Sequence, residues 1–301
     1  MAITSYNLKK WYKMLAGKSV LHVNQDIGKC FSVIEIKGYY NNLTEKVTKE
    51  PELLEFDELP KLVIENGDEI NFPVAIFQYG LGAYDLFLTS SDEKYLRKFR
   101  QCVDWAIKHQ EDSGAWSNFF YIYKEHPYGA MCQGEGASLL IRAYKQFKDE
   151  SYIVAARKAI EFMLKPVEQG GTSVYTAGLV LLEYTHLPVV LNGWIFSAFG
   201  LYDMSLITKE KQYKEAFEKT INTMLNKLAQ FDNGYWSLYD LDGKITSPFY
   251  HNLHIAQMQA LYQITGNKIF NEYVERWQKF QNSFWKEKRA LIKKAIQKVM
   301  E

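Results

Sequence analysis

From residue 73 onward, hydrophobic positions recur with a helical period, and loops containing Gly, Asn and Pro separate the helices. The helices come in pairs, in which an apolar helix precedes a more charged one. The first members are predicted at about 73–89, 130–147, 190–207 and 252–265. Their partners are predicted at about 92–110, 149–165, 209–229 and 267–284.

A tyrosine near the end of each apolar helix indicates an internal repeat. Tyr84, Tyr144, Tyr202 and Tyr262 recur at spacings of 60, 58 and 60 residues. A fixed period with one helical hairpin per unit means that each unit buries its apolar face against its neighbours. We therefore expect these four tyrosines to be structural.

The contrast between apolar and charged helices favours a closed double ring over an open stack, because inner helices wrapped by outer ones must be apolar. Six glycines fall in the predicted inner helices, where each costs about 1 kcal/mol relative to alanine unless close packing or a ligand compensates. The pattern predicts a mainly α fold over residues 69–301, an incomplete or complete (α/α) toroid of about four hairpins. Its long connections should form a cleft at one end.

The first residues differ from the rest of the chain. The segments SVLHVNQ, CFSVIEIKG and KLVIENG carry short β-branched runs bounded by Gly or Asn, which predict strands. The segment between the last two of these runs is polar and loop-like. Residues 1–68 are therefore predicted to form a small strand-containing extension or cap.

Composition and charge exclude several classes. The 36 Lys and Arg balance 35 Asp and Glu, so the basic field of a nucleic-acid-binding protein is missing. The three cysteines are far apart, no metal cluster or nucleotide loop is present, and neither a signal peptide nor a membrane-spanning run is evident. We expect no metal, no cofactor, no nucleic acid, no membrane span and a cytoplasmic location. The oligomeric state stays open, and a homo-oligomer is among the states allowed.

Aromatic residues make up 15% of the chain, and many lie in the long connections that follow the outer helices. Aromatic faces can pack against sugar rings, and long loops in compact domains are often functional. These connections should share one rim of the toroid. The rim would gather Trp116, Tyr121, Tyr123, His126, Glu183, Tyr184, His186, Tyr235, Trp236, Tyr239, Asp240, Tyr250, His251 and His254.

Three of these segments, LEYTHLPVVLNGWIFSAFGLYDM, GYWSLYDLDGK and SPFYHNLHIAQMQALY, resemble the signature segments of the D-glucuronyl C5-epimerases. The upstream segments INFPVAIFQYGLGAYD and YGAMCQGEGASLLIRAY are similar to that family as well, so the resemblance covers about 69–284. It implies a helical catalytic domain that inverts C5 of glucuronic acid residues in a heparan-like polysaccharide or oligosaccharide. Tyr184, Tyr239 and Tyr250 match the three active-site tyrosines of the family.

Two features depart from the family. Asp242 stands where the family usually has an arginine that can face the sugar carboxylate. The animal enzymes also carry a large β-rich region before the helical domain, for which only a short remnant could fit in this sequence. The substrate is therefore less well specified than the fold.

Tyrosines also suit the chemistry on independent grounds. Removing a proton next to a carboxylate requires a base on one face, an acid on the other, and hydrogen-bond donors around the carboxylate. A neighbouring cation or donor would lower the pKa of a tyrosine enough to make it the base. We assign Tyr184 and Tyr250 to the opposed pair and expect Tyr239 to bridge or polarise the site.

Eight further side chains are candidates for substrate binding, because they lie beside these tyrosines in the motifs, are polar residues on inner helices or, for Trp116, lie in a long connection at the rim. His251, His254, Asn192, Arg142 and Lys244 are the candidate donors to the carboxylate in place of the arginine. The complete set of predicted substrate-binding residues is Glu183, Asn192, His251, His254, Gln133, Arg142, Trp116 and Trp236.

Two other functions remain open at this stage. A lyase would begin with the same proton abstraction, and a hydrolase would need two carboxylic residues flanking the bond, for which Glu183 and Asp240 are the candidates. A non-catalytic glycan-binding protein would need the aromatic rim but not the tyrosine hydroxyls. Replacing Tyr184 and Tyr250 by Phe would separate this last function from catalysis.

Overall fold

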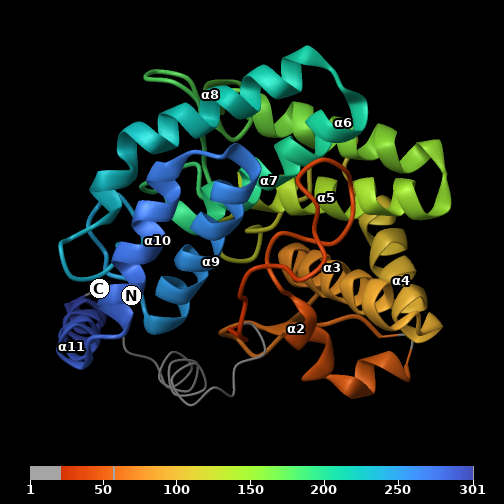
Figure 1. Cartoon of the computed structure of the whole chain (residues 1–301). Coiled ribbons are helices and arrows are strands. Elements are labelled where there is room, and N and C mark those ends of the chain that lie inside the picture. The colour runs from red at the N-terminus through yellow and green to blue at the C-terminus, as the bar shows by residue number, and fades with distance from the viewer. Residues whose placement is uncertain (1–21, 57, 301) are drawn as a thin grey trace.

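A computed structural model of the chain describes residues 22–56 and 58–300 and has the predicted helical architecture (Figure 1). The inner helices are α3 (Pro73–Ser90), α5 (Ala130–Phe147), α7 (Leu191–Thr208) and α9 (Pro248–Thr265). The outer helices are α4 (Glu93–His109), α6 (Glu150–Leu164), α8 (Lys211–Lys227) and α10 (Lys268–Gln281). The fold is a mainly α, (α/α) toroid, as the sequence predicts.

Each inner helix packs on its own outer helix and on the next inner helix, so α3, α5, α7 and α9 follow one another around the core. The outer helices are amphipathic, and three begin at a residue that caps the helix. Asp92, Asp149 and Asn267 each accept a hydrogen bond from the backbone N–H two residues later. The inner helices are buried on nearly all sides, which explains their continuous apolar sequence.

Close approach between inner helices explains Gly134 of α5 and Gly200 of α7. A Cβ atom added to Gly200 would collide with the backbone of Gly134 on the neighbouring helix. The prediction that close packing compensates for glycine is confirmed at this contact.

Strands are few and short among the described residues. β1 (Leu62–Val63) pairs antiparallel with β2 (Glu69–Ile70), with Leu62 opposite Ile70. β3 (Ser173–Val174) pairs antiparallel with β4 (Val180–Leu181), with Ser173 opposite Leu181. The remaining short elements are α2 (Thr44–Thr48) and three 3-10 turns at Pro51–Leu54, Val167–Gln169 and Leu228–Phe231.

The expectation of strands in the N-terminal part is only partly right. β1 forms within KLVIENG, whereas CFSVIEIKG forms bends. The first three residues of SVLHVNQ, 19–21, lie outside the described residues, and its last four, 22–25, form no strand. Ile27 makes a single antiparallel bridge to Asn41.

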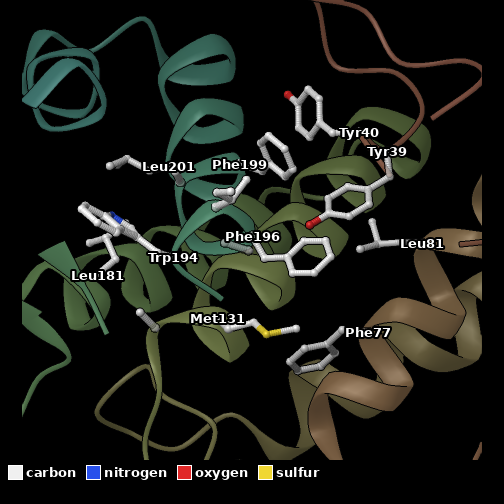
Figure 2. Packing of buried hydrophobic residues seen from close by; sticks show 14 of the residues in the cluster. Tyr39, Tyr40, Phe77, Leu81, Met131, Leu181, Trp194, Phe196, Phe199 and Leu201 are labelled. Carbon is white, nitrogen blue, oxygen red and sulfur yellow. The ribbon is translucent and has the colours of Figure 1, made fainter. Parts of the chain in front are cut away.

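Residues 36–47 fill the middle of the ring instead of covering it as a separate layer. Tyr39 and Tyr40 pack against Phe196 and Phe199 of α7, with the Tyr40 and Phe199 ring centroids 4.6 Å apart (Figure 2). The Tyr40 hydroxyl donates to Asp203 at 2.7 Å. This segment therefore belongs to the common core, and the domain boundary near residue 68 stays a prediction.

The C-terminal helix α11 (Phe284–Met300) braces the connection before α9. The Gln297 side chain accepts from the Ile245 N–H at 2.9 Å and donates to the Gly243 carbonyl at 3.1 Å. α11 thus holds the loop that carries Tyr239.

Candidate functional site

A cavity of about 210 Å³ lies where the N-terminal ends of the inner helices meet. Its lining includes Val74 and Gln78 of α3, Met131 of α5, Asn192 of α7 and Tyr250 of α9. The Tyr39 and Tyr40 segment lies against the opposite, C-terminal halves of α3, α5 and α7, where it bonds Asp85, Arg142 and Asp203. The toroid is therefore open to a ligand at one end, as predicted.

Four residues from the predicted set line this cavity, namely Glu183, Tyr184, Asn192 and Tyr250. Glu183 and Tyr184 follow the short strand β4, and Asn192 begins α7. Tyr250 lies in the first turn of α9, whose N-cap Ser247 accepts from the Tyr250 N–H. Capping thus fixes the backbone from which Tyr250 projects.

The three motif tyrosines come together, although Tyr239 does not itself line the cavity. The ring centroids of Tyr239 and Tyr250 are 5.1 Å apart in an edge-on arrangement. Tyr239 and Tyr184 share a side-chain hydrogen bond, and Tyr184 stacks on Phe119 with the centroids 4.5 Å apart. The three hydroxyl groups therefore form one cluster beside the cavity.

Burial changes the proton affinities in this cluster. It raises the pKa of Glu183 from 4.5 to about 7, although a hydrogen bond with Tyr184 opposes the rise. Burial likewise raises the pKa values of Tyr184, Tyr239 and Tyr250, and the nearby Glu183 carboxylate adds to each rise. The expectation that a neighbouring cation lowers a tyrosine pKa is wrong for this arrangement, and all three phenols are neutral near pH 7.

Several buried polar atoms in the cavity have no hydrogen-bond partner within the described protein. Gln25, Glu183 and Asn192 line the cavity and are at most 7% exposed, and each has a side-chain oxygen without a hydrogen-bond partner. Buried acceptors of this kind normally have a partner. Since all three atoms are acceptors, only hydrogen-bond donors can satisfy them.

Six predicted substrate-binding residues lie in the core and do not line the cavity. Trp116 is 1% exposed, and its indole N–H donates to the Ala106 carbonyl at 2.9 Å. Gln133 holds the Trp116 backbone through two bonds of 3.0 Å. Both side chains support the connection after α4, which corrects their predicted role.

The two histidines and Trp236 form a second structural cluster. His251 stacks on Trp236 with the ring centroids 3.8 Å apart, and its ring nitrogens bond Ser237 Oγ at 2.8 Å and the Trp277 carbonyl at 3.1 Å. His254 also bonds Ser237 Oγ, at 3.3 Å. Burial lowers the pKa values of His251 and His254 to about 4 and about 3, so both are neutral packing groups.

Arg142 and Lys244 are committed to other partners. The Arg142 guanidinium bonds Asp203 at 2.6 Å and the Gly38 carbonyl at 3.0 Å, in the half of α5 away from the cavity. Lys244 pairs with Asp240 at 3.6 Å, and Asp240 accepts from the N–H groups of Asp242 and Lys244. Asp240 therefore stabilises a turn and does not line the cavity, which removes the carboxylic pair considered for hydrolysis.

Sequence reasoning missed several residues that line the cavity. They include His22, Gln25 and Lys46 from the N-terminal segment, and Gln78 and Asn118 from the helical repeat. Asn118 accepts from the Val74 N–H at 3.3 Å, which fixes its amide at the start of α3. The polar character of residues 41–61 is compatible with a loop, and the helical spacing of Lys46 with Leu43 and Val47 is the one sign in the sequence that Lys46 turns inward.

Within the described part of the chain, no group of three His, Cys, Asp or Glu side chains is arranged to hold a metal ion. Helices of the same part are all too short or too polar to cross a bilayer. A larger groove of about 580 Å³ lies between α8 and the ends of α7 and α9, but none of the motif tyrosines lines it.

The fold and the cavity define an (α/α) toroid with a polar, tyrosine-lined site at one end of its ring. Residues 110–279, more than half of the chain, match the model of the D-glucuronyl C5-epimerase C-terminus. The chain belongs to this family.

Two relatives extend the comparison. The D-glucuronyl C5-epimerase of Caenorhabditis elegans is 27% identical over 220 residues, which cover 63% of this chain and 36% of the relative. An uncharacterised protein of Methanocaldococcus jannaschii is 31% identical over 156 residues, covering 50% and 51% of the two chains. The chain thus spans about a third to a half of these relatives.

Solved structures share the fold. The Lin0763 protein of Listeria innocua has a TM-score of 0.55 at 15% identity, with 78% of this chain and 63% of that chain covered. An unsaturated glucuronyl hydrolase specific for heparin also has a TM-score of 0.55, at 12% identity, with 80% and 66% covered. At these identities the likeness describes the architecture alone.

Proposed function

We propose that this protein is a carbohydrate-processing isomerase that inverts C5 of a glucuronic acid residue in a heparosan-like or heparan-like glycan. The observation that carries the proposal is the cluster of Tyr184, Tyr239 and Tyr250 with Glu183, beside a cavity with unpartnered buried acceptors. Membership of the epimerase family supports the same assignment.

The size of the cavity favours a single sugar ring as the enclosed part of the glycan. Its volume of about 210 Å³ is below the range of about 300–1,000 Å³ that is common for drug-sized ligands. The neighbouring residues of the glycan would extend outside. Exposed aromatic residues at this rim, such as Tyr121, are candidates to contact them.

Glu183 supplies the base that the neutral tyrosines lack. In the proposed step, the Tyr184 oxygen takes the C5 proton while its own hydroxyl proton passes to the Glu183 carboxylate. With a pKa of about 7, Glu183 is partly ionised at neutral pH, which suits a general base. The bond between C5 and hydrogen breaks, and its electron pair moves toward the sugar carboxyl group.

Tyr250 then returns a proton to C5 from the opposite face, which inverts the configuration. Tyr239 lies between the two, through its hydrogen bond with Tyr184 and its ring contact with Tyr250. It would carry a proton from the Glu183 and Tyr184 side back to Tyr250. The proton count is then balanced, and no cofactor is needed.

The test is incubation with a desulfated glucuronate polysaccharide in deuterated water, followed by NMR of deuterium at C5. Wild type should incorporate deuterium without chain cleavage. Tyr184→Phe and Tyr250→Phe should each lose at least about 100-fold of the rate, the lower end for general acid–base groups. Tyr262→Phe is the control, since Tyr262 lies at the far end of α9 and is 37% exposed.

Two other outcomes would redirect the assignment. An unsaturated, ultraviolet-absorbing product would indicate a lyase, which shares the first step but expels the substituent at C4. Binding of the glycan without exchange, unchanged in both Phe variants, would indicate a non-catalytic glycan-binding protein.

A further inference from the structure

Lys46 is the one lysine or arginine among the described residues that line the cavity. Its residue is only 4% exposed. The other buried cations serve the fold, since Lys98 donates to the carbonyls of Phe56 and Glu58 and Arg142 pairs with Asp203. Lys46 therefore brings a positive charge to the same cavity as the tyrosine cluster.

The position of Lys46 is fixed by packing of α2 against α3. A Cβ atom at Gly82 would collide with the Leu43 carbonyl oxygen, so only glycine allows this approach. Just before α2, the Asn42 side chain accepts from the Thr44 N–H at 3.1 Å, and Val47 is fully buried. The helix turn that carries Lys46 is thus fixed by the close approach of its backbone to Gly82 and by the burial of the Val47 side chain.

The electrostatic environment suits one anion. Lys46 interacts with Glu135 and Glu50, but burial raises the pKa of Glu135 to about 8 and that of Glu183 to about 7. Burial lowers the pKa of Lys46 itself to about 8, although Glu135 and Glu50 oppose this fall, so most of the lysine keeps its charge at neutral pH. The N-terminal ends of α3, α7 and α9 at the cavity also favour negative charge.

The cavity has separate partners for a carboxylate and for hydroxyls. Gln25, Glu183 and Asn192 present unpartnered acceptor oxygens, which can bind hydroxyl donors but would repel a carboxylate. An ammonium group has donors only. A ligand with one carboxylate and several hydroxyls therefore matches the two kinds of group together.

We propose that Lys46 binds the carboxylate of the uronate in this cavity and stabilises the charge that builds there when the C5 proton leaves. The inference rests on the proposed function and names the group that replaces the arginine at the Asp242 position. The other candidates for this role, Arg142, His251, His254 and Lys244, do not line the cavity. Lys46 carries a formal charge, whereas Asn192 offers only a neutral amide.

The test compares Lys46→Met with Lys49→Met, a control three residues away whose ammonium pairs with Glu45 and whose side chain is 43% exposed. Binding is measured by calorimetry for a glucuronate oligosaccharide and for the same oligosaccharide with its carboxyl groups reduced to alcohols. Wild type and Lys49→Met should prefer the glucuronate form. Lys46→Met should lose about 10- to 100-fold of that affinity, the size of one hydrogen bond to a charged group, and bind the reduced form unchanged.

Exchange of deuterium at C5 adds a second readout. Lys46→Met should lower the exchange rate by a larger factor than it lowers affinity, because the charge on the carboxyl group grows as the proton leaves. Lys46→Arg, which keeps the charge, should recover part of this rate. An unchanged exchange rate and affinity in Lys46→Met would overturn the role of Lys46 while leaving the epimerase proposal intact.

NMR of the wild-type protein keeps the inference testable if Lys46→Met does not fold. The pKa of Lys46, followed through its side-chain carbon resonance, should rise when the glucuronate oligosaccharide binds and not when the reduced form binds. Equal shifts with both ligands would refute carboxylate binding. If wild type discriminates the ligands through Lys46 but exchanges no deuterium, the Lys46 site stands and the epimerase function fails.

Discussion

Arg142 offers a sharp test of whether a conspicuous charged residue in the helical core serves the fold or the substrate. The Arg142 and Asp203 side chains are 1% and 0% exposed, and their closest atoms are 2.6 Å apart. The guanidinium also donates to the carbonyls of Ser138 and Gly38, each at 3.0 Å. Arg142 therefore ties α5, α7 and the N-terminal segment together.

Replacing Arg142 by Ala removes all of these bonds and leaves Asp203 buried with only its hydroxyl donors, Tyr40 and Ser138. Breaking a buried ion pair in this way typically costs about 3–5 kcal/mol. For a chain of this size, the corresponding fall in melting temperature is on the order of 10 °C. The surface pair of Arg157 and Glu210, 35% and 36% exposed, is the control, and Arg157→Ala should cost about 0–1 kcal/mol.

The assay is thermal and urea unfolding of both variants, with glycan affinity measured well below the melting temperature. Arg142→Ala should be strongly destabilised yet retain its affinity for the glycan when folded. The double variant Arg142→Met, Asp203→Leu should lose less than the sum of the two single changes, because no buried charge is left unpaired. If the melting temperature of Arg142→Ala fell no more than that of Arg157→Ala, and its affinity for the glycan were lost, this reasoning would be refuted. Arg142 would then again be a candidate substrate-binding residue.

Two further predictions concern buried titratable groups. His251→Ala should lower the free energy of unfolding by about 2–4 kcal/mol, because the Ser237 hydroxyl and Trp277 carbonyl lose their partner, while glycan affinity measured by calorimetry stays constant. Burial raises the pKa of Asp85 from 3.8 to about 7, so between these pH values the folded state keeps a proton that the unfolded state has lost. The free energy of unfolding therefore falls as the pH rises from about 4 to about 7. Asp85→Asn, which keeps the acceptor for the Tyr39 N–H, should flatten that part of the stability profile measured by urea unfolding, and an unchanged slope would contradict the assignment.

The helical repeat could be predicted because the local sequence and the fold agree. Caps such as Asp149 and the change from apolar to charged helices mark boundaries that lie within two residues of those observed for most helices. The sequence pattern predicts the start of α9 at residue 252, four residues later than its observed start at Pro248. Ser247 and Pro248 are a strong N-terminal pair for a helix, but they follow an aromatic loop and were assigned to it.

The site could be predicted only where a motif identified the residue. Tyr184, Tyr239 and Tyr250 come together as expected, whereas Arg142 and Gln133, chosen because they are polar on inner helices, have partners inside the protein. A polar residue in an apolar helix must have a partner, but the sequence does not say whether that partner is protein or ligand. The choice depends on which end of the helix faces the cavity.

The N-terminal segment shows the same limit from the opposite side. Leu43, Lys46 and Val47 have the i, i+3, i+4 spacing of a buried helix face, so the sequence does contain an indication that Lys46 turns inward. The side chain of a lysine at such a position can extend along the protein surface so that its ammonium reaches water, or the ammonium can lie inside a cavity. These alternatives have identical local sequences. They separate only when α3 supplies Gly82 for close packing and the inner helices supply a cavity, which is why the place of Lys46 in the cavity lining is visible in the tertiary structure and not in the motif.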